Sequence, residues 1–250
     1  ALLETKMLTK HFPGVVANEG IDFVLEEGEV HCLFGENGAG KSTLCSCLFG
    51  YYRPDGGSIE FKGEPVKFRS PRDSIRYGIG MVHQHFVLVD EFTVLENIIV
   101  GTNTEKWSLD LEASENQLKN ICDEYGIDLK FNSLVRDLSV GEQQWVEILK
   151  SLYLKVDILI LDEPTAVLTP EESNKLFKIM HKMGQNGISI IFISHKISEV
   201  MLADRVSVMS KGRLIDTVFP RETTPQELTN LMIGREVKLR VMEENDNEYD

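Results

Sequence analysis

The stretch Gly35-Glu36-Asn37-Gly38-Ala39-Gly40-Lys41-Ser42-Thr43 limits the fold of this 250-residue chain more than any other feature. It has the pattern of Gly, four residues, then Gly-Lys-Ser/Thr, in which backbone N–H groups surround a phosphate chain. The preceding Val30-His31-Cys32-Leu33-Phe34 is a short apolar run that predicts a buried strand, and residues 44–49 have apolar side chains at helical spacing. Glycine-rich turns between a strand and a helix also occur without a nucleotide, but the complete pattern in this setting favours a phosphate site.

Composition sets limits on the class of protein. At 250 residues the chain can form one large domain or two small ones, and its 42% of hydrophobic residues is enough for a buried core. Forty acidic and 26 basic residues give a net charge of −14, which argues against a nucleic-acid surface because phosphate backbones require clustered Lys and Arg. The four cysteines lack C-x-x-C spacing and are expected to be buried, reduced thiols of a cytosolic protein. No apolar stretch approaches the roughly 18 residues of a membrane span.

Four apolar runs of strand length each lead directly into polar residues. The runs end at Phe34, Val82, Leu161 and Ile193, and the polar groups that follow are the phosphate loop, Gln84, Asp162-Glu163 and His195. Parallel strands buried on both faces have continuous apolar sequences, and ligands bind at the carboxyl ends of such strands. We therefore expect one parallel sheet to gather all four polar groups at a single edge.

The chemistry of phosphoryl transfer suggests roles for the groups nearest the loop. Lys41 would neutralise charge on the terminal phosphates, and the Ser42 hydroxyl would bind Mg²⁺. Asp162 ends an apolar run, where a carboxylate can hold Mg²⁺ or its water. A solvated acidic turn before Pro164 is the alternative explanation for this carboxylate.

Three further side chains have candidate roles at the same edge. Glu163 is placed to accept a proton from the attacking water, and His195 to hydrogen-bond the γ-phosphate. Gln84 would contact the metal or the water through its amide oxygen. A His or Gln at a strand end is often only a structural group with satisfied hydrogen bonds, so the convergence of the four runs is what favours function.

The segment from about residue 87 to residue 152 has helical character. Thr93 with Glu96 forms a capping box, and residues 111–122 and 140–153 have helical periodicity. We expect this segment to be a largely helical insertion in an α/β core.

The start of the helix at residue 140 has two interpretations. Ser139 with Glu142 forms a capping box, which by itself is a complete structural explanation. The Ser139 hydroxyl, Gly141 and the helix N-terminus also form a candidate second anion site. Because this element lies far along the chain from the phosphate loop, the two need not share one nucleotide within one chain, and a dimer in which each site is built from both partners would use both.

Together these motifs resemble the nucleotide-binding subunit of an ATP-binding cassette (ABC) transporter, over roughly residues 3–235. The resemblance implies an α/β fold of the P-loop NTPase type, with a RecA-like core of mostly parallel sheet, an antiparallel β subdomain and an inserted helical subdomain. The implied division is a nucleotide-binding domain over residues 1–235, with its core at 1–86 and 153–235, its helical subdomain at 87–152, and an acidic flexible tail or linker at 236–250.

The resemblance implies ATP and Mg²⁺ as ligands. Phe12, which alone is more typical of a core or turn, occupies the place of the aromatic residue that stacks on adenine. Lys41, Ser42 and Thr43 would bind the phosphates together with the loop backbone.

The remaining roles implied by the resemblance concern the metal and the chemistry. Ser42, Gln84 and Asp162 would serve Mg²⁺. Glu163 would be the catalytic base and His195 the switch group.

Two residues depart from the pattern of the family. Val140 replaces the first glycine of Leu-Ser-Gly-Gly-Gln, but Ser139 and Gly141, the groups expected to reach the γ-phosphate on the partner domain, are present. Thr169 replaces an Asp that follows Ala-Leu, which keeps a helix cap and removes a carboxylate from the dimer interface. We expect phosphate binding to persist and communication between the sites to weaken.

Several local sequences narrow the subfamily. Met81-Val82-His83-Gln84-His85-Phe86, Ala166-Val167-Leu168-Thr169-Pro170 and Ile233-Gly234-Arg235-Glu236-Val237 are similar to the first cassette of tandem ATPases in sugar and nucleoside importers, the nucleoside branch most. We hypothesise that this chain is an N-terminal half of such a protein. The resemblance then implies an ATPase at the cytoplasmic face of the membrane, with a second cassette, permease subunits and, indirectly, a solute-binding protein as partners.

Two other classes remain as alternatives. One is a nucleotide-gated module whose partner cassette hydrolyses ATP, and the intact Glu163 and His195 argue against it. The other is a soluble cassette ATPase that acts on ribosomes or DNA, which the charge of −14 disfavours; we expect no nucleic-acid partner.

Overall fold

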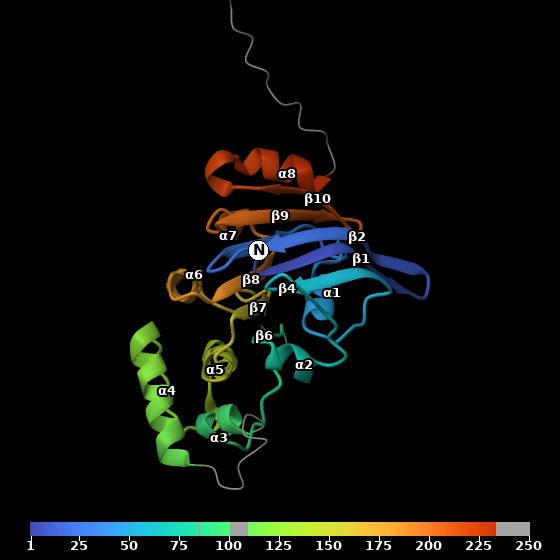
Figure 1. Cartoon of the computed structure of the whole chain (residues 1–250). Coiled ribbons are helices and arrows are strands. Elements are labelled where there is room, and N and C mark those ends of the chain that lie inside the picture. Colours follow the sequence, from blue (N-terminus) through green and yellow to red (C-terminus); the bar gives the residue numbers. More distant parts are fainter. Residues whose placement is uncertain (85, 101–109, 234–250) are drawn as a thin grey trace, which may run out of the picture.

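The chain folds into two sheets with helices packed around them and a helical part at one side (Figure 1). The computed structural model describes residues 1–84, 86–100 and 110–233. The predictions for His85 and for the acidic tail at 236–250 lie outside the described residues.

A six-stranded sheet forms the centre of the molecule. In chain order its strands are β3 (Val30–Phe34), β6 (Ile79–Val82), β7 (Ile158–Asp162), β8 (Ser189–Ser194), β9 (Arg205–Ser210) and β10 (Arg213–Val218). They lie in the order β10-β9-β3-β8-β7-β6, and every pair is parallel except β9 with β10. Residues 158–161 and 190–193 are fully buried because helices cover both faces of the sheet. The predicted parallel sheet and its α/β class are confirmed, and the four polar strand ends lie at one edge.

A second, antiparallel sheet packs beside the first. It consists of β1 (Leu3–Phe12), β2 (Val15–Leu25), β4 (Gly56–Phe61) and β5 (Glu64–Val66), in the order β2-β1-β4-β5. The sequence of residues 1–28 predicts short strand-like runs with a turn at Phe12-Pro13-Gly14. The turn is confirmed between β1 and β2, but these strands are 10 and 11 residues long. Register shifts in the β1–β2 ladder interrupt the alternation of buried and exposed side chains, which makes each long strand look like shorter runs.

Helices connect most of the parallel strands of the central sheet. The helices are α1 (Lys41–Leu48), α2 (Pro71–Arg76), α3 (Val94–Ile99), α4 (Leu111–Tyr125), α5 (Val140–Tyr153), α6 (Pro170–Gln185), α7 (Ile197–Val200) and α8 (Pro225–Ile233), with 3₁₀ turns at Val135–Asp137 and Pro220–Glu222. Of these, α3, α4 and α5 follow one another between β6 and β7. The predicted capping boxes at Thr93, Ser139 and Thr169 are confirmed, each with hydrogen bonds in both directions. Among the described helices, none has both the length and the apolar character needed to cross a membrane.

The sequence Ser70-Pro71-Arg72-Asp73 predicts the start of a short helix with Ser70 as its cap. Ser70 is the N-cap residue of α2, which confirms this start, but its side chain makes no cap hydrogen bond. The carboxylate of Asp73 accepts a hydrogen bond from the Arg69 backbone N–H at 2.9 Å, so the acidic residue of the first turn binds the preceding chain. Residues 66–68 have a strand-like sequence, but β5 ends at Val66, and the Phe68 ring packs on Tyr77 at 5.6 Å between centroids.

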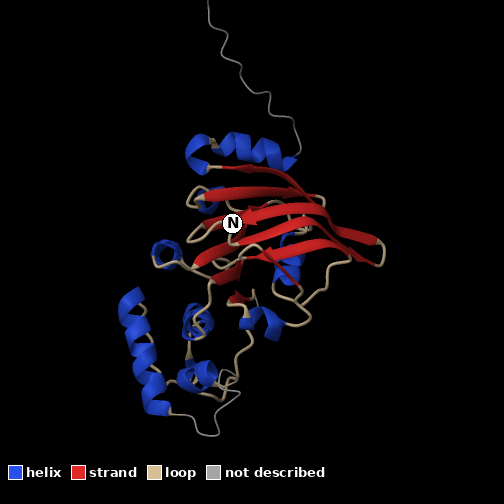
Figure 2. Cartoon of the chain, viewed as in Figure 1, coloured by secondary structure: helices blue, strands red, loops and turns tan. Residues whose placement is uncertain are grey.

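Two apolar cores lie on the two faces of the central sheet. Helix α1 fills the space between the sheets, where Leu44 and Leu48 are fully buried against the residues of both. The other face packs against α5 and α6, and this core continues into α3 and α4. Strands dominate the upper part of Figure 2, and α3, α4 and α5 extend away below them. The phosphate loop before α1 is therefore anchored between two rigid layers.

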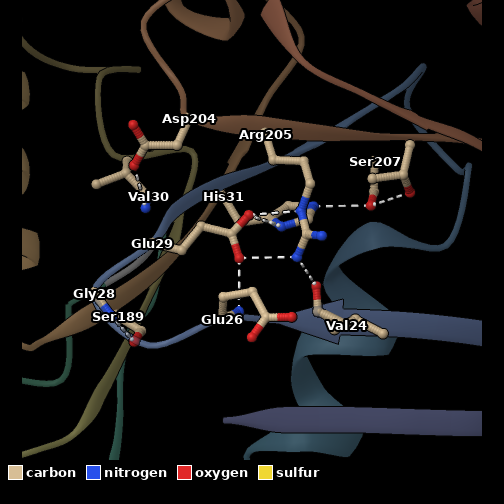
Figure 3. A network of polar contacts seen from close by, with 11 residues as sticks. Val24, Glu26, Gly28, Glu29, Val30, His31, Ser189, Asp204, Arg205 and Ser207 are labelled. Carbon is tan, nitrogen blue, oxygen red and sulfur yellow. Dashed lines mark hydrogen bonds and ion pairs between the residues drawn. The ribbon is translucent and has the colours of Figure 1, made fainter. Parts of the chain in front are cut away.

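A buried polar network joins the layers at the amino ends of β3 and β9 (Figure 3). The Glu29 carboxylate accepts hydrogen bonds from Arg205 Nε at 2.7 Å and Nη2 at 2.9 Å. Arg205 Nη2 also donates to the Val24 carbonyl at the end of β2, at 2.8 Å. His31, which is fully buried, lies 3.0 Å from Glu29 through Nδ1 and 2.8 Å from the Ser207 hydroxyl through Nε2.

Candidate functional site

The phosphate loop closes around its own lysine. Lys41 Nζ donates hydrogen bonds to the carbonyls of Gly35 and Glu36, both at 2.8 Å, and the residue is only 5% exposed. Burial lowers the pKa of the Lys41 ammonium, while the carboxylates of Glu163 and Asp162 oppose this shift. The loop thus holds a cation at its centre before any anion binds.

Two glycines let the loop pack tightly on its neighbours. A Cβ on Gly35 would lie 2.2 Å from the Met209 carbonyl oxygen on β9. Gly40 has φ +99°, and a Cβ there would lie 2.3 Å from the Ala17 carbonyl oxygen on β2. The side chain of Asn18 donates to the Gly40 carbonyl at 3.0 Å. These positions need glycine because backbone occupies the space of a side chain.

A cavity of about 460 Å³ opens beside the loop. Three segments line it: the β1–β2 hairpin with Phe12, Val15 and Ala17, the loop and helix start with Asn37, Gly38, Gly40, Lys41, Ser42 and Thr43, and the strand-end residues Gln84 and Glu163. A larger cavity of about 580 Å³ lies between α4 and residues 127–133, but it contains none of the predicted site residues. We therefore identify the candidate site by the residues that line the cavity and not by the volume of the cavity.

Ser42 lines the cavity and contacts Asp162, which is not among the described lining residues. The Ser42 hydroxyl donates to Asp162 Oδ1 at 3.3 Å, although the residues are 120 positions apart. Burial raises the pKa of the Asp162 carboxyl, and the hydrogen bond from Ser42 opposes the shift. The hydroxyl, the carboxylate and the Gln84 amide offer the oxygen ligands that Mg²⁺ prefers, so this donor set fits that ion.

Glu163 and His195 come together from adjacent strands. Glu163 follows β7, lines the cavity and has φ +47°, which is a left-handed backbone conformation. Its Oε1 atom lies 3.3 Å from Nδ1 of His195, which follows β8. His195 is not among the described residues that line the cavity, and it reaches the site through Glu163.

Phe12 and Gln84 reach the cavity from different parts of the chain. The Phe12 ring makes an edge-to-face contact with Tyr52, with 5.0 Å between centroids, and Lys10 Nζ lies 5.4 Å from the Phe12 centroid. Gln84 is exposed and follows β6 at the edge of the sheet. Both residues therefore border the cavity from separate elements.

The second predicted anion element is separate from this cavity. Ser139 and Gly141 are not among the described residues that line it. A Cβ on Gly141 would lie 3.0 Å from Glu172 Oε1 and 3.2 Å from Leu168 Cδ2, so this glycine lets the start of α5 pack on the start of α6. One chain thus presents the phosphate loop and the α5 N-terminus as two distinct surfaces.

The sequence matches the ABC transporter family over residues 18–166. This chain belongs to the ABC transporter family. The matched segment includes the phosphate loop, Gln84, the α5 start and Asp162-Glu163, while Phe12 and His195 lie outside it.

Individual ABC proteins resemble the chain along most of its length. The nucleoside import ATP-binding protein NupA of Lactococcus lactis subsp. cremoris is 49% identical over 232 residues, covering 92% of this chain and 46% of NupA. The guanosine import ATP-binding protein NupO of Bacillus subtilis is 48% identical over 241 residues, covering 96% of this chain and 47% of NupO. The chain therefore spans about half the length of these relatives. A crystal structure of an ATP-binding cassette of an ABC transporter in its ADP conformation superposes with a TM-score of 0.80 at 26% identity, covering 93% of this chain and 94% of that one.

Some residues of this ABC cassette escaped the sequence analysis. Val15 and Ala17 line the cavity, and Asn18 supports the loop, but all three lie in a strand whose alternation is interrupted. Thr165 and Glu199, which lie behind Glu163 and His195, were also missed. Thr165 follows β7 and Glu199 follows β8, and this position after two of the converging strands was the only feature of the sequence that could have pointed to them.

Proposed function

We propose that this chain binds ATP with Mg²⁺ and hydrolyses the bond to its γ-phosphate to power the import of a small solute. Of the two candidate solutes, a nucleoside and a simple sugar, we favour the nucleoside. The observation that supports it is a single cavity bordered by Lys41, Ser42, Gln84 and Glu163, which come from three different strand ends. Phosphoryl transfer requires positioning and charge neutralisation more than covalent chemistry, and these residue types supply both.

Each residue contributes from the cavity lining or, for Asp162 and His195, through contact with a lining residue. Lys41 and the loop N–H groups neutralise and orient the phosphates, and the apolar Phe12, Val15 and Ala17 accommodate the base. Ser42, Asp162 and Gln84 would hold Mg²⁺, which when bound neutralises charge that develops on the phosphate oxygens. Glu163 accepts the proton of the attacking water, and His195, 3.3 Å from it, orients this carboxylate and the γ-phosphate.

The partners follow from the separation of the two anion surfaces. Ser139 and Gly141 would complete the site of a second cassette, because they do not line the cavity of their own chain. We propose that a second cassette supplies this partner surface; the chain itself covers 46% of NupA and 47% of NupO. We further propose that α3, α4 and α5, which correspond to the helical segment predicted at residues 87–152, belong to a helical subdomain that contacts permease subunits at the cytoplasmic face of the membrane, with a solute-binding protein acting through that permease.

The nature of the solute rests on two supports. The His-Gln-His-Phe sequence resembles the nucleoside branch of importer ATPases, and NupA and NupO carry names that refer to nucleoside and guanosine import. Uptake of radiolabelled guanosine and ribose by cells with and without the gene distinguishes a nucleoside importer from a sugar importer.

The test of the activity is Glu163→Gln in the intact protein. The isosteric amide cannot accept a proton, so turnover should fall by about 10² to 10⁴-fold, while ATP affinity should change by no more than about twofold. Glu171→Gln, at an exposed position of α6, is the matched control and should keep full turnover. Turnover like wild type in Glu163→Gln would overturn the assignment of the base and favour hydrolysis in the partner cassette.

A further inference from the structure

Behind the candidate base lies a buried carboxylate with an unusual set of partners. Glu199 of α7 is 8% exposed. Its Oε1 atom accepts a hydrogen bond from the Thr165 hydroxyl at 2.5 Å, and Oε2 accepts one from the Ser194 hydroxyl at 2.6 Å. Both hydroxyl residues are 3% exposed. One carboxylate therefore connects two buried hydroxyl groups through its two oxygens.

The two hydroxyls belong to the loops that carry the candidate catalytic groups. Thr165 lies two residues after Glu163 in the loop that follows β7, and Ser194 directly precedes His195 at the end of β8. Strands β7 and β8 are parallel neighbours, so both loops leave the sheet side by side. Glu199 thus links the loop that carries Glu163 to the loop that carries His195.

Other contacts hold the same two loops. The Ser194 hydroxyl oxygen accepts a hydrogen bond from the Lys196 backbone N–H at 3.1 Å, which fixes its orientation toward Glu199. On the other side, the buried Gln144 of α5 donates from Nε2 to the Pro164 carbonyl at 2.6 Å. The Glu163–Thr165 segment is therefore fixed from both flanks.

The backbone of Glu163 needs such support. Its φ of +47° lies in the left-handed region, which a residue with a side chain occupies only when its surroundings impose it. The hydrogen bond between Thr165 and Glu199 acts two residues away from this position. Its loss would let the loop relax and move the Glu163 carboxylate away from His195.

We propose that Glu199 is a positioning residue for catalysis, which through Thr165 and Ser194 sets the distance between Glu163 and His195. This inference rests on the proposed ATPase activity. Glu199 acts through the two loops and touches neither the cavity lining nor Lys41 among the described residues, so its contribution belongs to the chemical step and not to ATP binding.

The test uses a pair of substitutions at Thr165 in the intact protein. Thr165→Val keeps the shape and removes the hydroxyl, whereas Thr165→Ser keeps the hydroxyl. Thr165→Val should lower kcat by about tenfold to a hundredfold, the effect of a small misplacement of a catalytic group, with KM for ATP within about twofold. Thr165→Ser should restore most of kcat. Hydrogen exchange of the amides at residues 163–169 should be faster in Thr165→Val than in Thr165→Ser.

Glu199→Gln provides a second, independent variant. It replaces one of the two acceptor oxygens with an amide donor, so one hydroxyl loses its partner, and kcat should again fall while KM stays within about twofold. A protein in which Thr165→Val and Thr165→Ser have the same kcat, or in which KM rises as much as kcat falls, overturns the proposal. An inactive wild-type protein contradicts the proposed function instead, so the two failures are distinguishable.

Discussion

Two buried glutamates lie at opposite ends of the same six-stranded sheet, and their surroundings differ. Glu29 directly precedes β3 at the amino ends of the strands and is 9% exposed. Glu199 lies in α7, after β8, at the carboxyl ends and is 8% exposed. Burial of a carboxylate is costly unless hydrogen bonds and charges compensate for the lost water, and the two ends compensate in different ways.

At the amino end, the guanidinium charge of Arg205 and the imidazole ring of His31 compensate for the burial of the Glu29 carboxylate (Figure 3). Arg205 donates hydrogen bonds to both carboxylate oxygens of Glu29. The His31 ring also contacts Glu29 Oε1, through Nδ1. Burial opposes ionisation of Glu29, but the hydrogen bonds from His31 and Arg205 outweigh it and hold the pKa of this carboxyl below its ordinary value. A planar, bidentate pair fixes the angle between elements, so this network joins β2, β3 and β9 as rigid parts.

At the carboxyl end, compensation comes mainly from hydroxyls. Each oxygen of Glu199 accepts from one Ser or Thr, and the nearest cation, Lys196 Nζ at 3.0 Å, has a side chain that is 43% exposed. Short bonds to two loops determine where those loops run but add little to the packing of layers. The same residue type thus joins layers of the fold at one end of the sheet and, in our proposal, positions two catalytic loops at the other.

The largest expected effect tests the amino end. Arg205→Met leaves the Glu29 carboxylate buried without its cation, so the free energy of unfolding should fall by about 3 kcal/mol. Turnover per folded molecule should not change, because the network lies at the end of the strands opposite the cavity. Urea unfolding followed by circular dichroism measures the first quantity and an ATPase assay the second.

Arg213→Met is the matched control for this prediction. Arg213 pairs with Glu19 at 2.8 Å, but the side chains are 63% and 50% exposed. Its loss should cost less than about 1 kcal/mol. Equal losses for Arg205→Met and Arg213→Met would mean that the amino-end network has no special role in stability.

A smaller effect is expected from pH. Burial lowers the pKa of His31 from its ordinary value of 6.5, although Glu29 opposes the shift, so the imidazole is neutral in the folded chain. The neutral ring then donates from Nδ1 to Glu29 and accepts the Ser207 hydroxyl at Nε2. As pH falls below about 6.5 the unfolded chain takes up more protons than the folded one, so stability is fully present above this pH and is lost below it.

The variant His31→Gln checks this dependence, because an amide offers a donor and an acceptor and does not titrate. The slope of unfolding free energy against pH just below 6.5 should become flatter than in the wild type. His11→Gln, at an exposed position, should leave the slope as it is. An unchanged slope in His31→Gln would contradict the assignment of the neutral imidazole.

The two ends also differ in how far they could be predicted. Lys41, Ser42, Gln84 and Glu163 were identified because each stands at or after the end of an apolar run, and the parallel sheet brings those ends together. Local signals of this kind also gave the capping boxes, whose partners are three residues apart.

Two of the pairs at the buried glutamates escaped because the partners are distant in sequence. Arg205 is 176 positions from Glu29, and Thr165 is 34 positions from Glu199. Their meeting depends on the strand order, with β9 next to β3 and β7 next to β8, which periodicity does not determine. At Ser70 the local pattern gave the N-cap position correctly but not the hydrogen bonding, because the Asp73 carboxylate accepts the Arg69 backbone N–H while the Ser70 side chain makes no cap hydrogen bond.

The smallest expected change in unfolding free energy comes from Lys196→Met, and it directly compares the two buried glutamates. Lys196→Met removes the cation beside Glu199 just as Arg205→Met removes the cation beside Glu29. Because Lys196 is 43% exposed and Glu199 keeps both hydroxyl donors, the unfolding free energy should fall by less than about 1 kcal/mol. Lys196→Met also removes the contacts of Nζ with the Thr165 hydroxyl at 3.2 Å and carbonyl at 3.4 Å. Turnover should still fall less than in Thr165→Val, since Thr165 and Ser194 keep their hydrogen bonds to Glu199. If Lys196→Met instead destabilises the protein as strongly as Arg205→Met, both carboxylates depend on their ion pairs, and the distinction between a stabilising end and a positioning end is wrong.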